Sequence, residues 1–212
     1  MDSKIALLGK FQTLETFHLS EFRLFIALNF SQQVLDKITH ALEELKGYFQ
    51  QPGLRWVATD KIHLTLKFLG NVPHSRLPEI YSAIQKTAIK SMPCQVSLSH
   101  LGAFPSIKNP NVIWIGVKPD DALLQLAKIL EINFEAINFP AEARGFSPHI
   151  TLARVSRNTS PLERQGIAAQ LSQIDLAPLG QDVFSEIYLF KSEFYQGSYV
   201  YTILRTEKLV AQ

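Results

Sequence analysis

The sequence predicts a protein of mixed strands and helices that is built from two similar lobes. Apolar segments with the two-residue period of a strand alternate along the whole chain with segments at helical spacing. A short pattern, His-x-Thr inside an apolar strand, occurs once in each half, at 63–65 and 149–151. Positions 63 and 149 differ by 86 residues, which is too long for a solenoid repeat and suits a duplicated lobe.

The composition is that of an ordinary soluble globular protein with a substantial core. Of its 212 residues, 46% are hydrophobic and 19% are charged. The chain has 21 Lys and Arg residues and 19 Asp and Glu residues, which gives a net charge of +2. This small excess excludes binding of a long duplex through many phosphate contacts, so any nucleic-acid site must be small and local. The single Cys94 excludes an internal disulfide and a cysteine-based zinc site, fits a reducing cytoplasm, and is expected to be buried and inert.

Residues 1–20 are interpreted as an N-terminal extension ahead of a single bilobal domain at 21–212. The apolar run IALLG within them is too short for a signal peptide, and no small-residue cleavage pattern follows it. No segment approaches the roughly 20 apolar residues that cross a bilayer. We therefore expect a cytoplasmic monomer without membrane contact.

The first half predicts strands separated by helices and turns. Residues 22–30 form an apolar strand, and Ser31 is the expected N-cap of a helix. Two further strands, 54–57 and 62–70, flank a Thr59-Asp60 turn. A second helix before Pro93 is marked by apolar residues at helical spacing, Ile80, Ile84 and Ala88.

The second half repeats this mixture. Strands are predicted at 94–104 and 111–117, joined by a loop that contains Pro105 and Pro110. A helix follows from Asp120 or Asp121, then a strand at 149–155. The remaining predictions are a helix that begins at Ser160 and Pro161 and a closing hairpin of 182–193 with 198–209.

Within each H-x-T strand the polar pair shares one face. Because successive strand side chains point to opposite sides, His63 and Thr65 lie on one face, about 7 Å apart, and the neighbouring leucines lie on the other. His149 and Thr151 repeat the arrangement. If the lobes face each other, the four polar groups meet.

Two facing imidazoles with two hydroxyls are suited to cleavage of a phosphodiester. One neutral imidazole takes a proton from the attacking oxygen, and the other, protonated, gives one to the leaving oxygen. The hydroxyls donate hydrogen bonds to the phosphate oxygens. A lone strand histidine is usually structural, but two copies in the matching contexts HLTL and HITL favour function.

Several blocks of the sequence resemble the 2H phosphoesterase superfamily, named for two H-x-[TS]-x motifs. The chain is most similar to the bacterial and archaeal RNA 2′,3′-cyclic phosphodiesterases, also called 2′-5′ RNA ligases. The resemblance runs in order through RLFIALNF, LRWVATDKIHLTLKFLGNV, NVIWIGV, FSPHITLAR and IYLFKSEF, which covers nearly everything after residue 21.

The resemblance implies an α+β bilobal fold, in which two antiparallel sheets flanked by helices form a cleft with one motif on each wall. It implies opening of a terminal 2′,3′-cyclic phosphate, on RNA ends or nucleotides, to a 2′-phosphate without metal or cofactor. His63 would donate a proton to the departing 3′ oxygen and His149 would activate water. Thr65, Thr151 and Arg154 would hold the phosphate.

Three residues near the motifs have two interpretations each. Arg154 is five residues after His149, so a regular strand puts them on opposite faces; either the strand bulges or ends near Ala153, or Arg154 is structural. The same two-residue period puts Lys67 on the face of His63. There it either adds positive charge beside the phosphate or is a solvated lysine at the end of the strand. Phe146 either stacks on a terminal base or packs in the core.

Other functions remain open from the sequence. The same residues would serve the reverse reaction, the joining of a cyclic-phosphate end to a 5′-hydroxyl. A non-catalytic module that binds nucleotides or RNA ends is the alternative of another class. A metal site on His63 and His149 is disfavoured, because no Asp, Glu or Cys recurs in the two motifs. The natural substrate, whether tRNA fragments, other RNA or cyclic nucleotides, is not determined.

Overall fold

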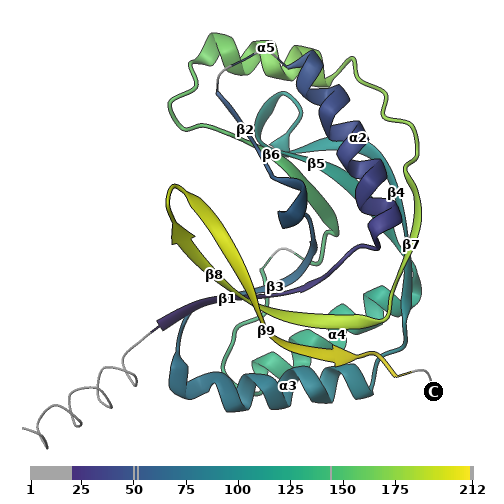
Figure 1. The fold of residues 1–212 in the computed structure, drawn as a ribbon, viewed down its shortest axis with the longest axis vertical. Coiled ribbons are helices and arrows are strands. Elements are labelled where there is room, and N and C mark those ends of the chain that lie inside the picture. Colours follow the sequence, from purple (N-terminus) through teal and green to yellow (C-terminus); the bar gives the residue numbers. More distant parts are fainter. Residues whose placement is uncertain (1–20, 50, 52, 144, 211–212) are drawn as a thin grey trace, which may run out of the picture.

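The predicted lobes are two antiparallel sheets on opposite sides of a cleft, flanked by helices, and the α+β bilobal prediction is confirmed (Figure 1). The computed structural model describes residues 21–49, 51, 53–143 and 145–210. The predicted extension, residues 1–20, lies outside the described residues. None of the helices in the described ranges combines the length and the apolar character that a membrane crossing requires.

The first sheet has four strands in the order β3-β1-β8-β9. They are β1 (Glu21–Leu28), β3 (Leu64–Pro73), β8 (Glu186–Tyr195) and β9 (Ser198–Lys208). Two helices that contact each other, α3 (Leu77–Ile89) and α4 (Asp121–Glu135), lie against the side of this sheet that faces away from the cleft (Figure 1). A short 3₁₀ turn, η2 (His74–Arg76), leads from β3 into α3.

The second sheet has five strands in the order β2-β6-β5-β4-β7. They are β2 (Leu54–Trp56), β4 (Cys94–Ser106), β5 (Asn109–Pro119), β6 (His149–Val155) and β7 (Gly180–Phe184). Its lobe contains α2 (Gln32–Tyr48) and α5 (Pro161–Leu171) (Figure 1). The 3₁₀ turn η1 (Thr59–Lys61) leads from β2 of this sheet to β3 of the other.

The two sheets share one spatial order of paired strands, although the chain connects the strands of each sheet in a different sequence. In the first, the H-x-T strand β3 pairs with β1, which pairs with β8; in the second, β6 pairs with β5, which pairs with β4. The strand order β3-β1-β8-β9 thus corresponds to β6-β5-β4-β7, with β2 added beside β6. Each H-x-T strand therefore holds the same place in its lobe.

The helix starts are mostly where the capping residues predict them. Asp120 accepts a hydrogen bond from the Leu123 amide at 2.8 Å at the start of α4, and Ser160 and Glu163 form a reciprocal capping box on α5. Ser31 occupies the N-cap position of α2, but its side chain makes no capping bond. Its amide instead donates to the Asp182 carboxylate at 2.7 Å, which ties α2 to β7.

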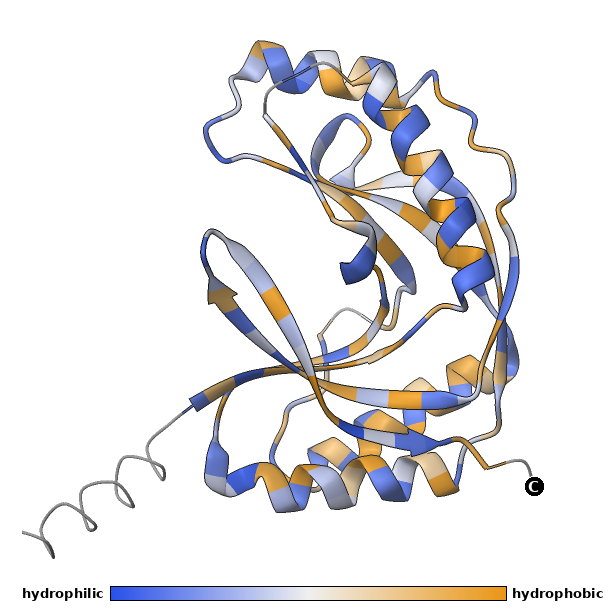
Figure 2. Ribbon diagram, in the orientation of Figure 1, coloured by the Kyte–Doolittle hydropathy of each residue, from blue (hydrophilic) through white to orange (hydrophobic). Residues whose placement is uncertain are grey.

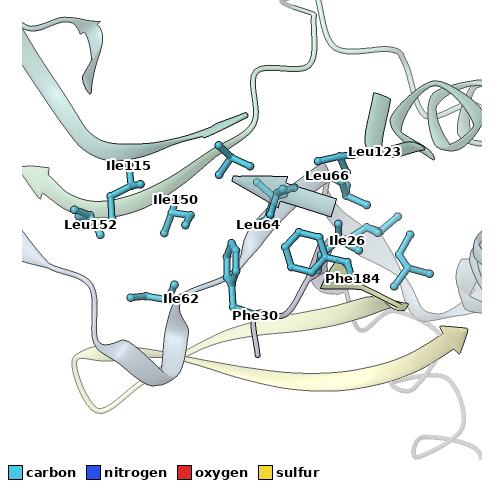
Figure 3. Packing of buried hydrophobic residues seen from close by; sticks show 14 of the residues in the cluster. Ile26, Phe30, Ile62, Leu64, Leu66, Ile115, Leu123, Ile150, Leu152 and Phe184 are labelled. Carbon is cyan, nitrogen blue, oxygen red and sulfur yellow. The ribbon is translucent and has the colours of Figure 1, made fainter. Parts of the chain in front are cut away.

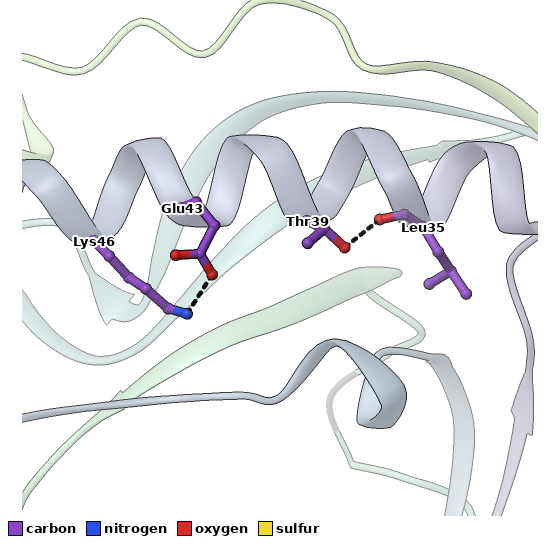
Figure 4. A network of polar contacts seen from close by, with 4 residues as sticks. All are labelled: Leu35, Thr39, Glu43 and Lys46. Carbon is purple, nitrogen blue, oxygen red and sulfur yellow. Dashed lines mark hydrogen bonds and ion pairs between the residues drawn. The ribbon is translucent and has the colours of Figure 1, made fainter.

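Helix α2 has one apolar and one polar face. Its buried residues recur at helical spacing: Val34, Ile38, Ala41, Leu42 and Leu45. Elsewhere on the helix, Lys46 pairs with Glu43 at 2.7 Å and the Thr39 hydroxyl donates to the Leu35 carbonyl at 2.7 Å (Figure 4). Figure 2 shows the same division into apolar and polar residues along the other helices and strands.

One hydrophobic core runs through both lobes. Leu64 of β3 and Ile150 of β6, each one residue after a motif histidine, are fully buried in a single cluster (Figure 3). Cys94 is buried in the same cluster, as predicted, and burial raises the pKa of its thiol to about 12. Because the two H-x-T strands share this core, their apolar faces fix the position of one strand relative to the other.

The predicted strand at 182–193 is two strands that belong to different sheets. Residues 180–184 form β7 and pair with β4, whereas residues 186–195 form β8 and pair with β1. The chain crosses between the lobes at Ser185. Continuous apolar character gives no sign of such a crossing, since both strands have a buried face. The loop predicted around Pro105 and Pro110 is also shorter, because β4 and β5 run through both prolines.

Lys67 does not lie on the face of His63, so the prediction for this residue was wrong. On β1, Ile26 pairs with Lys67 and Ala27 with Thr65, which leaves Leu66 of β3 without a partner. This one-residue shift reverses the alternation of side chains. Lys67 consequently points away from the cleft and is only 1% exposed, with its ammonium 2.6 Å from the Glu131 carboxylate and 2.9 Å from the Pro140 carbonyl.

We expect Glu131→Gln to destabilise the fold more than Lys67→Met. Removal of the carboxylate leaves a buried ammonium without its counter-charge, at a cost of about 3 kcal/mol. Removal of the ammonium leaves Glu131, which is 28% exposed and keeps access to water, so we expect about half that cost. Urea unfolding measures both, with the exposed Glu135→Gln on the same helix as the control. The reverse ranking would contradict this reasoning.

Candidate active site

The register shift of β3 recurs at the equivalent place on β6. A shift between Ile113 and Trp114 of β5 leaves Leu152 of β6 without a partner. Residues 149–155 therefore have the same sequence of exposure as residues 63–69, with two consecutive buried residues after the motif and then an exposed one. That exposed residue is Arg154, which returns to the face of His149 and Thr151.

All five residues predicted for the site line one cleft between the sheets, with a volume of about 1230 Å³. His63 and Thr65 come from the wall formed by the first sheet. His149, Thr151 and Arg154 come from the wall formed by the second. The structure thus brings together the two motifs that are far apart in the sequence.

His63 is enclosed by aromatic rings. Its imidazole stacks on Phe25 with ring centroids 4.8 Å apart and meets Tyr201 edge-on at 5.5 Å. Its Nδ1 lies 2.8 Å from the Lys61 carbonyl oxygen. Burial lowers the pKa of His63 from its ordinary value to about 4, and the hydrogen bond to the carbonyl opposes this shift only partly. The neutral imidazole is therefore favoured in the protein without ligand.

His149 has the same hydrogen bond in a more open setting. Its Nδ1 lies 2.8 Å from the Ser147 carbonyl oxygen, again two residues earlier in the chain. Its ring meets Phe104 edge-on at 4.9 Å and lies 6.2 Å from Trp114. The Trp114 ring in turn occupies the space over Gly102, where a Cβ atom would lie 2.1 Å from the indole, so this close approach requires glycine.

The hydrogen bonds to the Lys61 and Ser147 carbonyl oxygens determine which ring nitrogen of each histidine is available for proton transfer. A carbonyl oxygen only accepts, so Nδ1 must carry a proton in both histidines. The remaining nitrogen, Nε2, is then an acceptor when the ring is neutral and a donor when it is charged. Each wall of the cleft therefore presents one nitrogen that can take or give a proton.

The cleft concentrates positive charge in a protein that is nearly neutral overall. Its lining includes six Arg and Lys residues and, among the described residues, no Asp or Glu: Arg23, Arg55, Lys61, Arg154, Arg157 and Arg164. No described carboxylate lies within ion-pair distance of any of them. Because field lines concentrate in such a cleft, the site favours an anionic ligand.

Sequence reasoning missed several lining residues, and of its two interpretations of Phe146 the structure supports packing in the core. Phe68 follows the register shift of β3, as Arg154 does on β6, and is 58% exposed to the cleft. The sequence did contain a signal for Phe68: it follows His63 by five residues, just as Arg154 follows His149 by five. Phe146 packs against the core cluster and is not part of the cleft lining.

The residues that the structure describes do not include a cluster of potential metal ligands. In the ranges that the structure describes, no group of three or more His, Cys, Asp or Glu side chains is arranged to hold a metal ion. A second hollow of about 790 Å³, between α2 and residues 173–180, contains none of the five predicted site residues.

Comparison with known proteins identifies similar sequences. Residues 28–114 match the family model described as LigT-like phosphoesterase. The matched segment includes the first H-x-T motif, at 63–65. The RNA 2′,3′-cyclic phosphodiesterase of Methanothermobacter thermautotrophicus is 27% identical over 187 residues, which cover 88% of this chain and 98% of that protein. The RNA 2′,3′-cyclic phosphodiesterase of Archaeoglobus fulgidus is 32% identical over 135 residues, which cover 64% of this chain and 73% of that protein.

Solved structures extend the similarity to the whole described fold. The crystal structure of E. coli LigT complexed with 3′-AMP superposes with a TM-score of 0.71 at 26% sequence identity. The superposition covers 91% of this chain and 100% of the E. coli chain. Both lobes, and therefore both walls of the cleft, have counterparts in that protein.

The burial of His63 predicts a loss of stability in acid. Its pKa is about 4 in the folded protein and about 6.5 in an unfolded chain, so between these values the unfolded state binds more protons. The stabilisation is complete above pH 6.5 and is lost as the pH falls toward 4. From pH 7.5 to 4.5 we expect wild type to lose about 2–3 kcal/mol more than His63→Gln, measured by urea unfolding. Equal losses would show that His63 is not held neutral.

Proposed function

Because this chain belongs to the LigT-like phosphoesterase family, we propose that it opens the 2′,3′-cyclic phosphate at the end of an RNA strand. The observation that carries the proposal is the matched pair of histidines on one cleft. Each has its Nδ1 fixed by a backbone carbonyl, which leaves Nε2 for proton transfer. A cationic lining without described carboxylates suits the phosphate.

His149 is the proposed base and His63 the proposed acid, as the family resemblance implies. His149 removes a proton from water, and the water oxygen forms a new bond to phosphorus. The bond from phosphorus to the 3′ oxygen breaks, and His63 gives its proton to that oxygen. The product carries a 3′-hydroxyl and a 2′-phosphate. Each proton transfer of this kind contributes about 10²–10⁴-fold to the rate.

Thr65, Thr151 and Arg154 are the proposed phosphate ligands. The two hydroxyls donate to non-bridging oxygens from opposite walls, and the guanidinium adds a charged donor. Their value to the reaction is that they hold the phosphate between the two Nε2 atoms, which provides proximity and orientation.

The burial of His63 connects substrate binding to its acid role. An acid must be protonated before it can act, but burial favours the neutral ring in the protein without ligand. A phosphate anion beside the ring favours the charged form, since a nearby negative charge raises the pKa of a histidine. We propose that the bound phosphate favours protonation of the His63 imidazole, which later gives this proton to the leaving 3′ oxygen.

We expect His63→Ala and His149→Ala each to lower kcat/KM for an oligoribonucleotide with a 2′,3′-cyclic phosphate end by at least about 100-fold. His40→Ala is the matched control, because His40 lies on α2 outside the cleft and, of the residues that the structure describes, pairs with Glu44 alone. Circular dichroism and urea unfolding check that all three variants fold. We also expect EDTA to leave wild-type activity unchanged.

Full activity in either cleft variant would overturn the proposed pair. The same assay separates the other two functions. Joining of the cyclic-phosphate end to a strand with a 5′-hydroxyl would indicate the ligase direction. Tight binding of the strand without turnover would indicate a binding module, and would contradict the proposed hydrolysis.

A further inference from the structure

The proposed catalytic groups occupy only part of the cleft. Pockets for small ligands typically measure roughly 300–1,000 Å³. The volume of about 1230 Å³ between the sheets is larger, and its lining extends along β6 and β2 on one wall and to the β8–β9 hairpin on the other. The ribbon of the β8–β9 hairpin lies across from that of β2 (Figure 1), and both elements contribute residues to the cleft lining.

Two arginines face each other on neighbouring strands. Arg55 of β2 is the direct partner of Arg154 of β6. Directly opposite residues of an antiparallel pair have Cα atoms about 4.5–5.5 Å apart, and like charges placed so are destabilising. Both side chains are exposed, and neither guanidinium makes a hydrogen bond or an ion pair with a described residue. This pair lacks an anion to neutralise it.

A third unpaired cation follows Arg154 by three residues in the chain. Arg157 occupies the turn after β6, lines the same cleft and likewise has no described carboxylate within ion-pair distance. Two of the three other lining cations already donate hydrogen bonds within the protein: Arg164 donates to the Asn111 side chain at 2.7 Å, and Lys61 donates to Ser198 at 2.5 Å. Arg55 and Arg157 are therefore two cations of the lining, in addition to the proposed ligand Arg154, that no described carboxylate neutralises.

An aromatic ring and a cation lie on the opposite wall. Tyr199 of the β8–β9 hairpin is 43% exposed and lines the cleft. The guanidinium of Arg23 lies 5.7 Å from the centre of its ring. Grooves for single-stranded nucleic acid combine these two elements, cations that follow the backbone and aromatic rings on which bases stack.

We infer that the cleft contains a second subsite, which binds the nucleotide that precedes the cyclic end of an RNA strand. Arg55 and Arg157 bind the backbone phosphate of that nucleotide, and Tyr199 with Arg23 receives its base. The inference rests on the proposed function. It names a strand, rather than a free cyclic nucleotide, as the preferred substrate, because only a strand supplies a second phosphate and a second base.

The test compares two substrates, 2′,3′-cyclic AMP and a trinucleotide with a 2′,3′-cyclic phosphate end. For Arg55→Gln/Arg157→Gln we expect kcat/KM to fall about 10- to 100-fold with the trinucleotide and by a factor at least about five times smaller with cyclic AMP, which meets only the general positive charge of the cleft. The salt dependence with the trinucleotide should become shallower by about 0.7 in log–log slope, because the double variant no longer neutralises the backbone phosphate. Lys90→Gln, at the end of α3 outside the cleft lining, is the control for charge.

A second variant isolates the base. Tyr199→Ala should lower kcat/KM about 5- to 100-fold with the trinucleotide. With a trinucleotide whose penultimate position has no base, the same substitution should have less than about a twofold effect. Equal decreases with cyclic AMP and the trinucleotide, or no decrease with either, would overturn the inference.

Binding measurements keep this inference separate from the proposed reaction. If the wild-type protein turns over neither substrate, the proposed function fails. Fluorescence anisotropy with a labelled trinucleotide that ends in a 2′-phosphate still tests the subsite, with adenosine 2′-phosphate as the competitor. We expect the strand to bind at least about tenfold more tightly than the mononucleotide, and the arginine double variant to reduce the difference, because only stacking on Tyr199 then remains. Equal affinities in the wild type would refute a second subsite.

Discussion

The arrangement of the cleft depends on an unpaired residue three positions after the histidine of each motif, Leu66 or Leu152. Leu66 and Leu152 have no partner on the adjacent strand, so each strand presents two buried residues in succession. The first part of the strand then aims a histidine and a threonine at the cleft, and the second part aims Phe68 or Arg154 at the same cleft. A regular strand would instead turn these last two side chains into the core. The shared hydrophobic core holds both strands in this relation.

Duplication provides two similar histidines, and their surroundings make them different. Both donate from Nδ1 to the carbonyl two residues earlier. His63 is enclosed by Phe25 and Tyr201, whereas His149 meets the edge of Phe104 in a more open position. Different surroundings can push the pKa values of two like groups apart, which suits a reaction that needs one base and one acid. In the proposed reaction the phosphate anion of the substrate raises the pKa of His63, which burial lowers in the protein without ligand.

Periodicity was sufficient to find both motifs, the helix starts at Asp120 and Ser160, and the faces of His63 and His149. It failed at Lys67, because a one-residue register shift depends on how two strands pair and leaves no mark in either strand alone. It also failed at residues 182–193, where the chain crosses between sheets within one apolar segment. Arg55 and Arg157 were missed because they join Arg154 only after β2 pairs with β6. Features that depend on one strand were predictable, whereas of those that depend on pairing only the bulge near Ala153 was among the interpretations of the sequence.

The position of the new phosphate is the most direct measure of whether two histidines act from opposite walls in the proposed roles. An oligoribonucleotide with a 2′,3′-cyclic phosphate end can be incubated with the protein in EDTA, and its product identified by ³¹P NMR. If His63 protonates the 3′ oxygen while His149 directs water to phosphorus, every product end carries a 2′-phosphate. A 3′-phosphate, or a mixture of the two, would contradict this assignment of acid and base.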